Sequence, residues 1–82
     1  MKKNKIIRKI DNYINDKKFS IVYKNRSLNV INYTKIIDFT DSLISVEYKE
    51  NYYYIEGDKL VISKMMEDEI LITGNIKKIT LI

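Results

Sequence analysis

The chain has 82 residues, of which 45% are hydrophobic and 32% charged, and its formal net charge is +4. This length allows one domain, and the composition is that of a folded soluble protein rather than a disordered segment. The sequence contains no cysteine and no histidine, which excludes a disulfide framework, a thiolate metal site and an imidazole base.

The first 18 residues are basic and differ in character from the rest. Residues 1–18 hold seven Lys/Arg against two acidic residues, a net charge of +5, whereas residues 19–82 hold eight against nine, a net charge of −1. The spacing of Ile6, Ile10 and Ile14 puts these side chains on one helical face. The sequence therefore predicts a basic amphipathic helix over residues 1–18, followed by one domain over residues 19–82.

Two interpretations of this helix remain open. Its apolar face can pack on the rest of the protein while the lysines face water. Alternatively, its basic face can lie on an anionic membrane or bind a partner. The candidate residues for that contact are Lys2, Lys3, Lys5, Arg8 and Lys9.

No targeting or membrane-spanning segment is visible in the sequence. A signal peptide needs an unbroken apolar run of about 7–15 residues, and charged residues interrupt the stretch that follows the basic N-terminus. No run approaches the roughly 18 apolar residues of a membrane span. We therefore expect a cytoplasmic protein.

From Phe19 the hydrophobic period changes from that of a helix to that of a strand. Apolar residues alternate with polar ones around Ile21, Val30, Val46 and Ile72, and β-branched and aromatic types dominate. Turn signals separate these runs at Asn25-Arg26, Thr40-Asp41-Ser42 and Glu50-Asn51. The prediction is a mainly β protein, an antiparallel meander of about six to eight short strands curled into a roll or small sandwich.

The two glycines stand in similar surroundings. Gly57 and Gly74 are each preceded by an apolar-polar pair and followed by a polar residue, which gives a weak internal repeat. A two-residue hairpin favours glycine at the position that needs positive φ. We therefore expect both glycines in hairpin turns rather than in phosphate-binding loops.

The inventory of reactive side chains is poor. The only acidic run, Glu67, Asp68 and Glu69, is interpreted as a solvated loop, because three consecutive carboxylates do not converge on a metal ion by themselves. No catalytic, cofactor-binding or metal-binding residue stands out. A non-enzyme is predicted, and a carboxylate-based enzyme is the weakest alternative.

The tyrosines are the most informative side chains. In a strand, Tyr52 and Tyr54 share one face while Tyr53 and Ile55 share the other, and Ile55 falls in register with the core. Tyr52 and Tyr54 either pack across strands on a half-exposed sheet or form a protein-contact surface.

Aromatic strands and a basic chain also suggest a small OB-like nucleic-acid-binding module. Such a module needs cations beside its aromatic platform. Glu47, Glu50 and Glu56 stand near these tyrosines instead, with Lys49 as the basic neighbour, so nucleic-acid binding is the less favoured alternative.

Two stretches resemble the YabP/YqfC family of sporulation proteins. VINYTKIIDFTDSLISV, residues 30–46, is similar to the family's strand, Asn-containing turn, strand ending in Phe and next strand. YIEGDKLVISKMMEDEILITGNIKKITLI, residues 54–82, is similar to the closing block, with Gly57, Glu69 and Gly74 at the family's glycine and acidic places. The basic segment before the sheet favours the YqfC-type branch.

The resemblance implies a non-enzymatic structural or adaptor protein made in the mother cell during endospore formation, without a cofactor. Family genes often lie beside genes for integral membrane sporulation proteins, which implies a membrane-embedded protein partner. Peripheral contact with a membrane and association with further copies of the chain are compatible with the same expectation.

Overall fold

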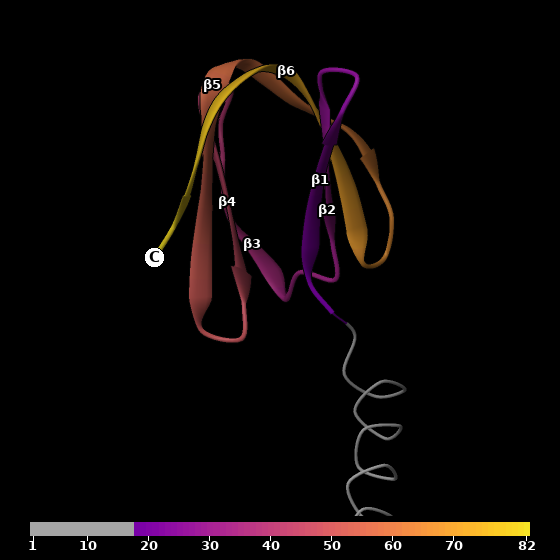
Figure 1. Cartoon of the computed structure of the whole chain (residues 1–82), viewed down its shortest axis with the longest axis vertical. Helices are drawn as coiled ribbons and strands as arrows, with labels where there is room; N and C mark the ends of the chain where they lie inside the picture. The colour runs from indigo at the N-terminus through magenta and orange to yellow at the C-terminus, as the bar shows by residue number, and fades with distance from the viewer. Residues whose placement is uncertain (1–17) are drawn as a thin grey trace, which may run out of the picture.

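The computed structural model describes residues 18–82 of the chain, and these residues form an all-β structure (Figure 1). The predicted N-terminal helix and the basic residues Lys2, Lys3, Lys5, Arg8 and Lys9 lie outside the described part. Six antiparallel strands form one sheet in the order β1-β2-β6-β5-β4-β3. They are β1 (Ser20–Lys24), β2 (Ser27–Ile31), β3 (Lys35–Phe39), β4 (Leu43–Tyr48), β5 (Asn51–Met65) and β6 (Glu69–Leu81).

The predicted antiparallel sheet is confirmed, but only strands β3 to β6 form a meander. Strands β3 to β6 are neighbours in sequence order, whereas β2 pairs with β6 and not with β3. The β2–β6 register aligns Val30 with Ile70 and Leu28 with Ile72. This pairing places apolar side chains of the two strands on the same face, which stabilises a neighbour that chain order alone does not suggest.

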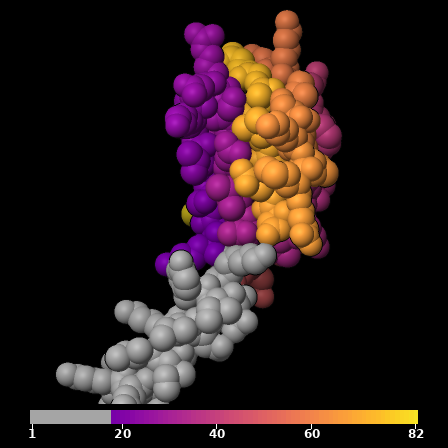
Figure 2. Space-filling model, turned by 90° about the vertical axis from the view of Figure 1, so that its right-hand side faces the viewer, coloured from indigo at the N-terminus to yellow at the C-terminus, as the bar shows by residue number. Residues whose placement is uncertain are grey.

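The sheet folds over on itself because β5 and β6 are long and bend together (Figure 1). The first half of β5 and the second half of β6 join β4 and β3 in one layer, called here the β3 layer. The other halves join β2 and β1 in the β1 layer. Figure 2 views the β1 layer from outside, with β1 and β2 beside the orange segment of β5 and β6.

The core lies between the two layers. Alternate residues of β2, β4, β5 and β6 face inwards, as the period of two dictates. Seven of them are fully buried and Leu60 is 3% exposed. The set is Leu28, Val30, Ile44, Val46, Ile55, Leu60, Ile70 and Ile72.

Two of the predicted turns are confirmed and one is displaced. Asn25 and Arg26 connect β1 to β2 with φ of 53° and 60°, the positive values that a type I′ hairpin requires. The loop at Thr40 closes β3 onto β4, since Thr40 Oγ1 accepts hydrogen bonds from two backbone N–H groups. The next turn uses Lys49 and Glu50, one residue earlier than predicted, and Asn51 already belongs to β5.

The prediction that Gly57 and Gly74 form hairpin turns is wrong. Both lie inside strands, Gly57 in β5 and Gly74 in β6, where the two strands bend. Only Gly74 has a positive φ, of 121°. The weak repeat in the sequence therefore marks the shared bend of one long hairpin, not two successive hairpins.

Close backbone approach explains why glycine occupies both positions. A Cβ on Gly57 would overlap the carbonyl oxygen of Asn75, and a Cβ on Gly74 would overlap that of Lys59. Register shifts between Glu56 and Gly57, and between Asp58 and Val61, accompany the bend. Bulges of this kind increase twist and curvature, which turns the strands from one layer into the other.

We predict that Gly57→Ala and Gly74→Ala each lower the free energy of unfolding substantially. Strain of the positive φ alone is worth about 1–3 kcal/mol at Gly74, and steric overlap adds to it. Urea denaturation measures the effect. The control is Asp58→Ala in the same bend, whose exposed ion pair is worth about 1 kcal/mol or less. Unchanged unfolding midpoints for both glycine variants would contradict the tight bend.

Ile55 tests the assignment of the core. Its side chain is 0% exposed, as the sequence predicted. Ile55→Ala should lower the free energy of unfolding by about 2–5 kcal/mol, because it removes buried methyl groups and leaves a cavity. Val61→Ala in the same strand is the control, since Val61 is 51% exposed and its loss should cost about 0.5 kcal/mol.

Candidate protein-contact face

The outward side of the β3 layer carries both candidate tyrosines and is called here the tyrosine face. Cross-strand register defines it: Tyr54 lies between Ser45 of β4 and Thr80 of β6, and Glu56 lies between Leu43 and Lys78. The eleven residues that share this face are Lys35, Asp38, Leu43, Ser45, Glu47, Tyr52, Tyr54, Glu56, Lys78, Thr80 and Ile82.

The strand period separates the four central aromatic and apolar residues as predicted. Ile55 is buried, and Tyr53 faces inwards, where its ring stacks on Phe19 with centroids 4.4 Å apart. Tyr52 is exposed and Tyr54 is half-buried on the opposite side. Strand alternation thus places Tyr52 and Tyr54 on the surface, while Tyr53 and Phe19 fill the end of the core.

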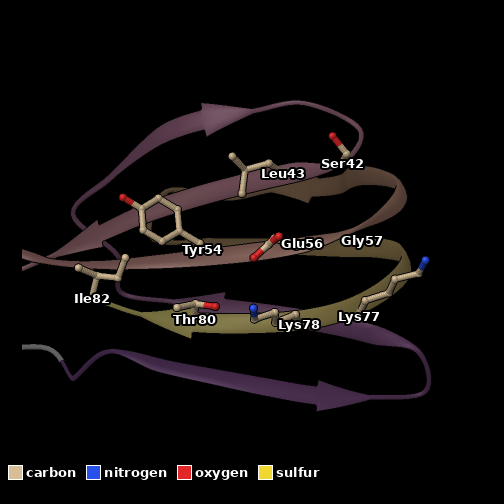
Figure 3. A pocket seen from close by; sticks show the side chains of 9 residues that line it. All are labelled: Ser42, Leu43, Tyr54, Glu56, Gly57, Lys77, Lys78, Thr80 and Ile82. Carbon is tan, nitrogen blue, oxygen red and sulfur yellow. The ribbon is translucent and has the colours of Figure 1, made fainter.

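A hollow of about 760 Å³ opens on the tyrosine face (Figure 3). Tyr54 lies beside it with Leu43 on one neighbouring strand and Thr80 on the other. The small residues Ser42 and Gly57 leave space between these larger side chains. The complete lining is Ser42, Leu43, Tyr54, Glu56, Gly57, Lys77, Lys78, Thr80 and Ile82.

Charges of both signs surround the apolar part of the hollow. Glu56 and Lys78 are register partners across β5 and β6, and Lys77 forms an ion pair with Asp58 at 2.7 Å. Glu47, further along β4, pairs with Lys35 at 3.6 Å. An apolar, aromatic centre with a polar and charged rim is the usual anatomy of a protein–protein interface.

A partly buried hydrogen bond joins β4 to β3 on the tyrosine face. Ser45 is fully buried, and its hydroxyl donates to Oδ2 of Asp38 on the neighbouring strand at 2.9 Å. The bond satisfies a polar group that would otherwise be costly to bury. It also ties β3 to β4 beside the bulge between Ile36 and Asp38.

The electrostatics of this face do not favour a nucleic-acid platform. Glu47 is the register partner of Tyr52, and Glu56 follows Tyr54 on the same side of β5. A backbone-binding site needs an excess of cations next to the stacking rings. Here Lys77 and Lys78 lie near Tyr54. However, Asp58 and Glu56 balance their charge. The OB-like alternative therefore gains no support from the position of these tyrosines.

The acidic run lies in the turn between β5 and β6, at the end of the β1 layer away from the bend at Gly57 and Gly74. Glu67 and Asp68 connect β5 to β6, and Glu69 accepts a hydrogen bond from the Asn29 side chain at 2.6 Å. Among residues 18–82, no group of three His, Cys, Asp or Glu side chains converges as a metal site would require. Within the same residues, no helix of the length and hydropathy of a membrane span occurs.

Sequence reasoning found the tyrosines and two of their neighbours, Glu47 and Glu56, but not the other residues of this face. Leu43, Lys78 and Ile82 reach the tyrosine face from β4 and from the end of β6, far from Tyr54 in the chain. In each strand these residues alternate with core residues, so the sequence alone could have placed them on the outward side of the sheet. Only the pairing register shows that these sides meet.

Residues 18–82 define a small all-β domain with an aromatic, mixed-charge surface on one layer of a folded sheet. The chain belongs to the YabP family, whose family model matches residues 15–82. This match confirms the resemblance seen in the sequence, while the preference for the YqfC-type branch stays a prediction. No curated protein and no solved structure matches the chain.

Proposed function

We propose that this protein is a non-enzymatic structural or adaptor protein of endospore formation, acting through protein contacts made by the tyrosine face. Membership of the YabP family associates the chain with sporulation. The observation that carries the adaptor role is the hollow beside Tyr54, where apolar, aromatic and charged side chains from three strands converge.

The chemistry of the hollow favours a protein as its occupant. Tyrosine offers a large, rigid contact area together with a hydroxyl that can pair, which is why it is enriched among interface residues that dominate binding. The rim of Glu56, Lys77 and Lys78 supplies both signs of charge. A partner with complementary charges would be selected over competitors by this arrangement.

We further propose that the partner is an integral membrane sporulation protein, met in the mother-cell cytoplasm. The family resemblance motivates this choice, together with the basic N-terminal segment of the sequence. That segment would hold the protein near an anionic membrane surface while the tyrosine face binds the cytoplasmic part of the partner.

Replacing both Tyr52 and Tyr54 by Ser should leave the chain folded but reduce heat-resistant spore counts. Truncating interface aromatics often costs about 2 kcal/mol or more of binding free energy, or roughly thirtyfold in affinity. Circular dichroism of the purified variant checks folding, and spore counts after allelic replacement in the host check function.

The matched control is Tyr23→Ser, the same chemical change at an exposed tyrosine of β1 outside the tyrosine face. It should sporulate normally. Normal spore counts for the folded double variant would overturn the assignment of the contact to this face. Equal losses for the double variant and for Tyr23→Ser would show that the effect is not specific to the face.

The basic segment makes a separate prediction. Changing Lys2, Lys3, Lys5, Arg8 and Lys9 to Gln in the full chain should abolish co-sedimentation with anionic vesicles, because each lysine or arginine near such a surface contributes about 1 kcal/mol. Wild-type binding should also weaken as salt is raised. The control carries Gln at Lys24, Lys35, Lys59 and Lys64 instead. Equal binding by both variants would exclude the segment as the anchor.

A further inference from the structure

Among the strands of residues 18–82, each layer of the folded sheet ends in two unpaired edges, because β5 and β6 change neighbours at the bend. The β1 layer ends at β1 and at the second half of β5, and the β3 layer ends at β3 and at the second half of β6. At each edge, one apolar or aromatic side chain lies in register with an inward-facing residue of the neighbouring strand. Although these side chains point to the core side, they are 57–61% exposed. These edge residues are Tyr23, Phe39, Met65 and Leu81.

The backbone at the end of β6 is oriented for further pairing. Tyr52 and Ile82 exchange two hydrogen bonds, with N···O distances of 3.0 and 2.8 Å. In an antiparallel ladder such pairs alternate with pairs that make no bond, so the N–H and C=O groups of Leu81 and Ile79 point to the open side. No strand within residues 18–82 lies beyond this edge.

The opposite edge of the same layer, β3, offers a matching backbone. The N–H of Thr40 donates to the carbonyl of Leu43 at 2.8 Å, so Thr40 faces β4 and Phe39 directs its backbone groups outwards. Ile37 and Phe39 are 43% and 57% exposed on this edge. Both edges of the β3 layer thus combine available backbone groups with exposed apolar side chains.

The two edges differ in charge. Residues 75–82 contain Lys77 and Lys78 and no acidic residue. The β3 edge and its turn contain Asp38 and Asp41, and the one lysine of β3, Lys35, pairs with Glu47 of β4. We propose that a second copy of this chain adds its β3 edge to the β6 edge of the first, so that copies associate head to tail into a continuous antiparallel sheet. The β3 layer has four strands of alternating direction, so β3 of the next copy runs antiparallel to β6.

A definite register satisfies backbone, apolar and charged groups together. Placing Ile79 opposite Phe39 of the next copy joins two residues whose backbone groups both point outwards and whose side chains both face the core side. The same register sets Lys77 opposite Asp41 and Lys78 diagonally across from Asp38. Opposite charges at such cross-strand positions stabilise the pair.

Electrostatics distinguishes this arrangement from a two-fold dimer. Pairing β6 with β6 would gather four lysines in one ribbon. Pairing β3 with β3 would gather four aspartates against two lysines, each Lys35 being already paired with Glu47 of its own copy. Like charges across strands destabilise the pairing. Unlike edges join head to tail and generate rings or filaments rather than a closed pair.

The test is sedimentation velocity of the full chain and of two proline variants, Ile79→Pro and Phe39→Pro. Each proline removes an N–H that points to the open edge, which an edge strand tolerates. Wild type should associate as concentration rises and dissociate with salt. Each variant alone should form dimers at least tenfold more weakly. An equimolar mixture should regain a one-to-one dimer, because each variant keeps the edge that the other lacks.

Three outcomes would overturn the proposal: a wild-type chain that stays monomeric up to about 1 mM, a single variant that associates like wild type, or a mixture that does not dimerise. If Phe39→Pro lowers the melting temperature, Phe39→Lys replaces it, since a cation there repels Lys77 and Lys78 without altering the backbone. The contact uses Lys78 and Asp38 at the two margins of the tyrosine face but neither Tyr52 nor Tyr54, so the spore-count experiment on these two tyrosines is decided separately.

Discussion

The backbones of β5 and β6 come too close at Gly57 and Gly74 for a side chain to lie between them. This approach lets the long hairpin bend instead of continuing as a flat ribbon, and the register shifts around it complete the change of direction. The turn between β3 and β4 is fastened at the same place, because the N–H groups of Gly57 and Leu60 donate to the carbonyls of Ser42 and Asp41.

The bend divides the sheet into two layers that enclose the core between them. By folding one sheet over, it brings Leu28 and Ile72 of the β1 layer against Ile44 and Ile55 of the β3 layer, and a thin core becomes sufficient for a domain of this size. The outward side of the β3 layer is then free to present tyrosines without exposing the core. The hollow beside Tyr54 reaches the bend itself, since Gly57 forms part of its lining.

A folded single sheet also has more open edges than a flat one, and this links the architecture to association. Natural sheets often protect edges with lysines and bulges. Here β6 carries Lys77 and Lys78, and β3 carries a bulge, but their opposite charges make the edges complementary rather than mutually repellent. In our proposals, the tyrosine face binds a partner protein and the edges of the β3 layer bind further copies of the chain.

The sequence by itself determined the strand content, the inward position of Ile55, the outward position of Tyr52 and Tyr54, and the hairpin at Asn25-Arg26. These features follow from local rules, namely a side-chain period of two and the φ preferences of turn residues. The resemblance to the YabP family also rests on local motifs, because the order of apolar runs and glycines can be recognised in the sequence without knowing which residues are in contact.

Only the tertiary structure decided the role of Gly57 and Gly74, the pairing of β2 with β6, and the neighbours of Tyr54. A glycine followed by a polar residue has the same local signature in a hairpin turn as in a bent strand. The difference lies in Asn75 and Lys59, whose carbonyl oxygens occupy the space of a Cβ, and which reach the glycines through the β5–β6 register. Register is a property of two strands at once, so a pattern within one strand cannot specify it.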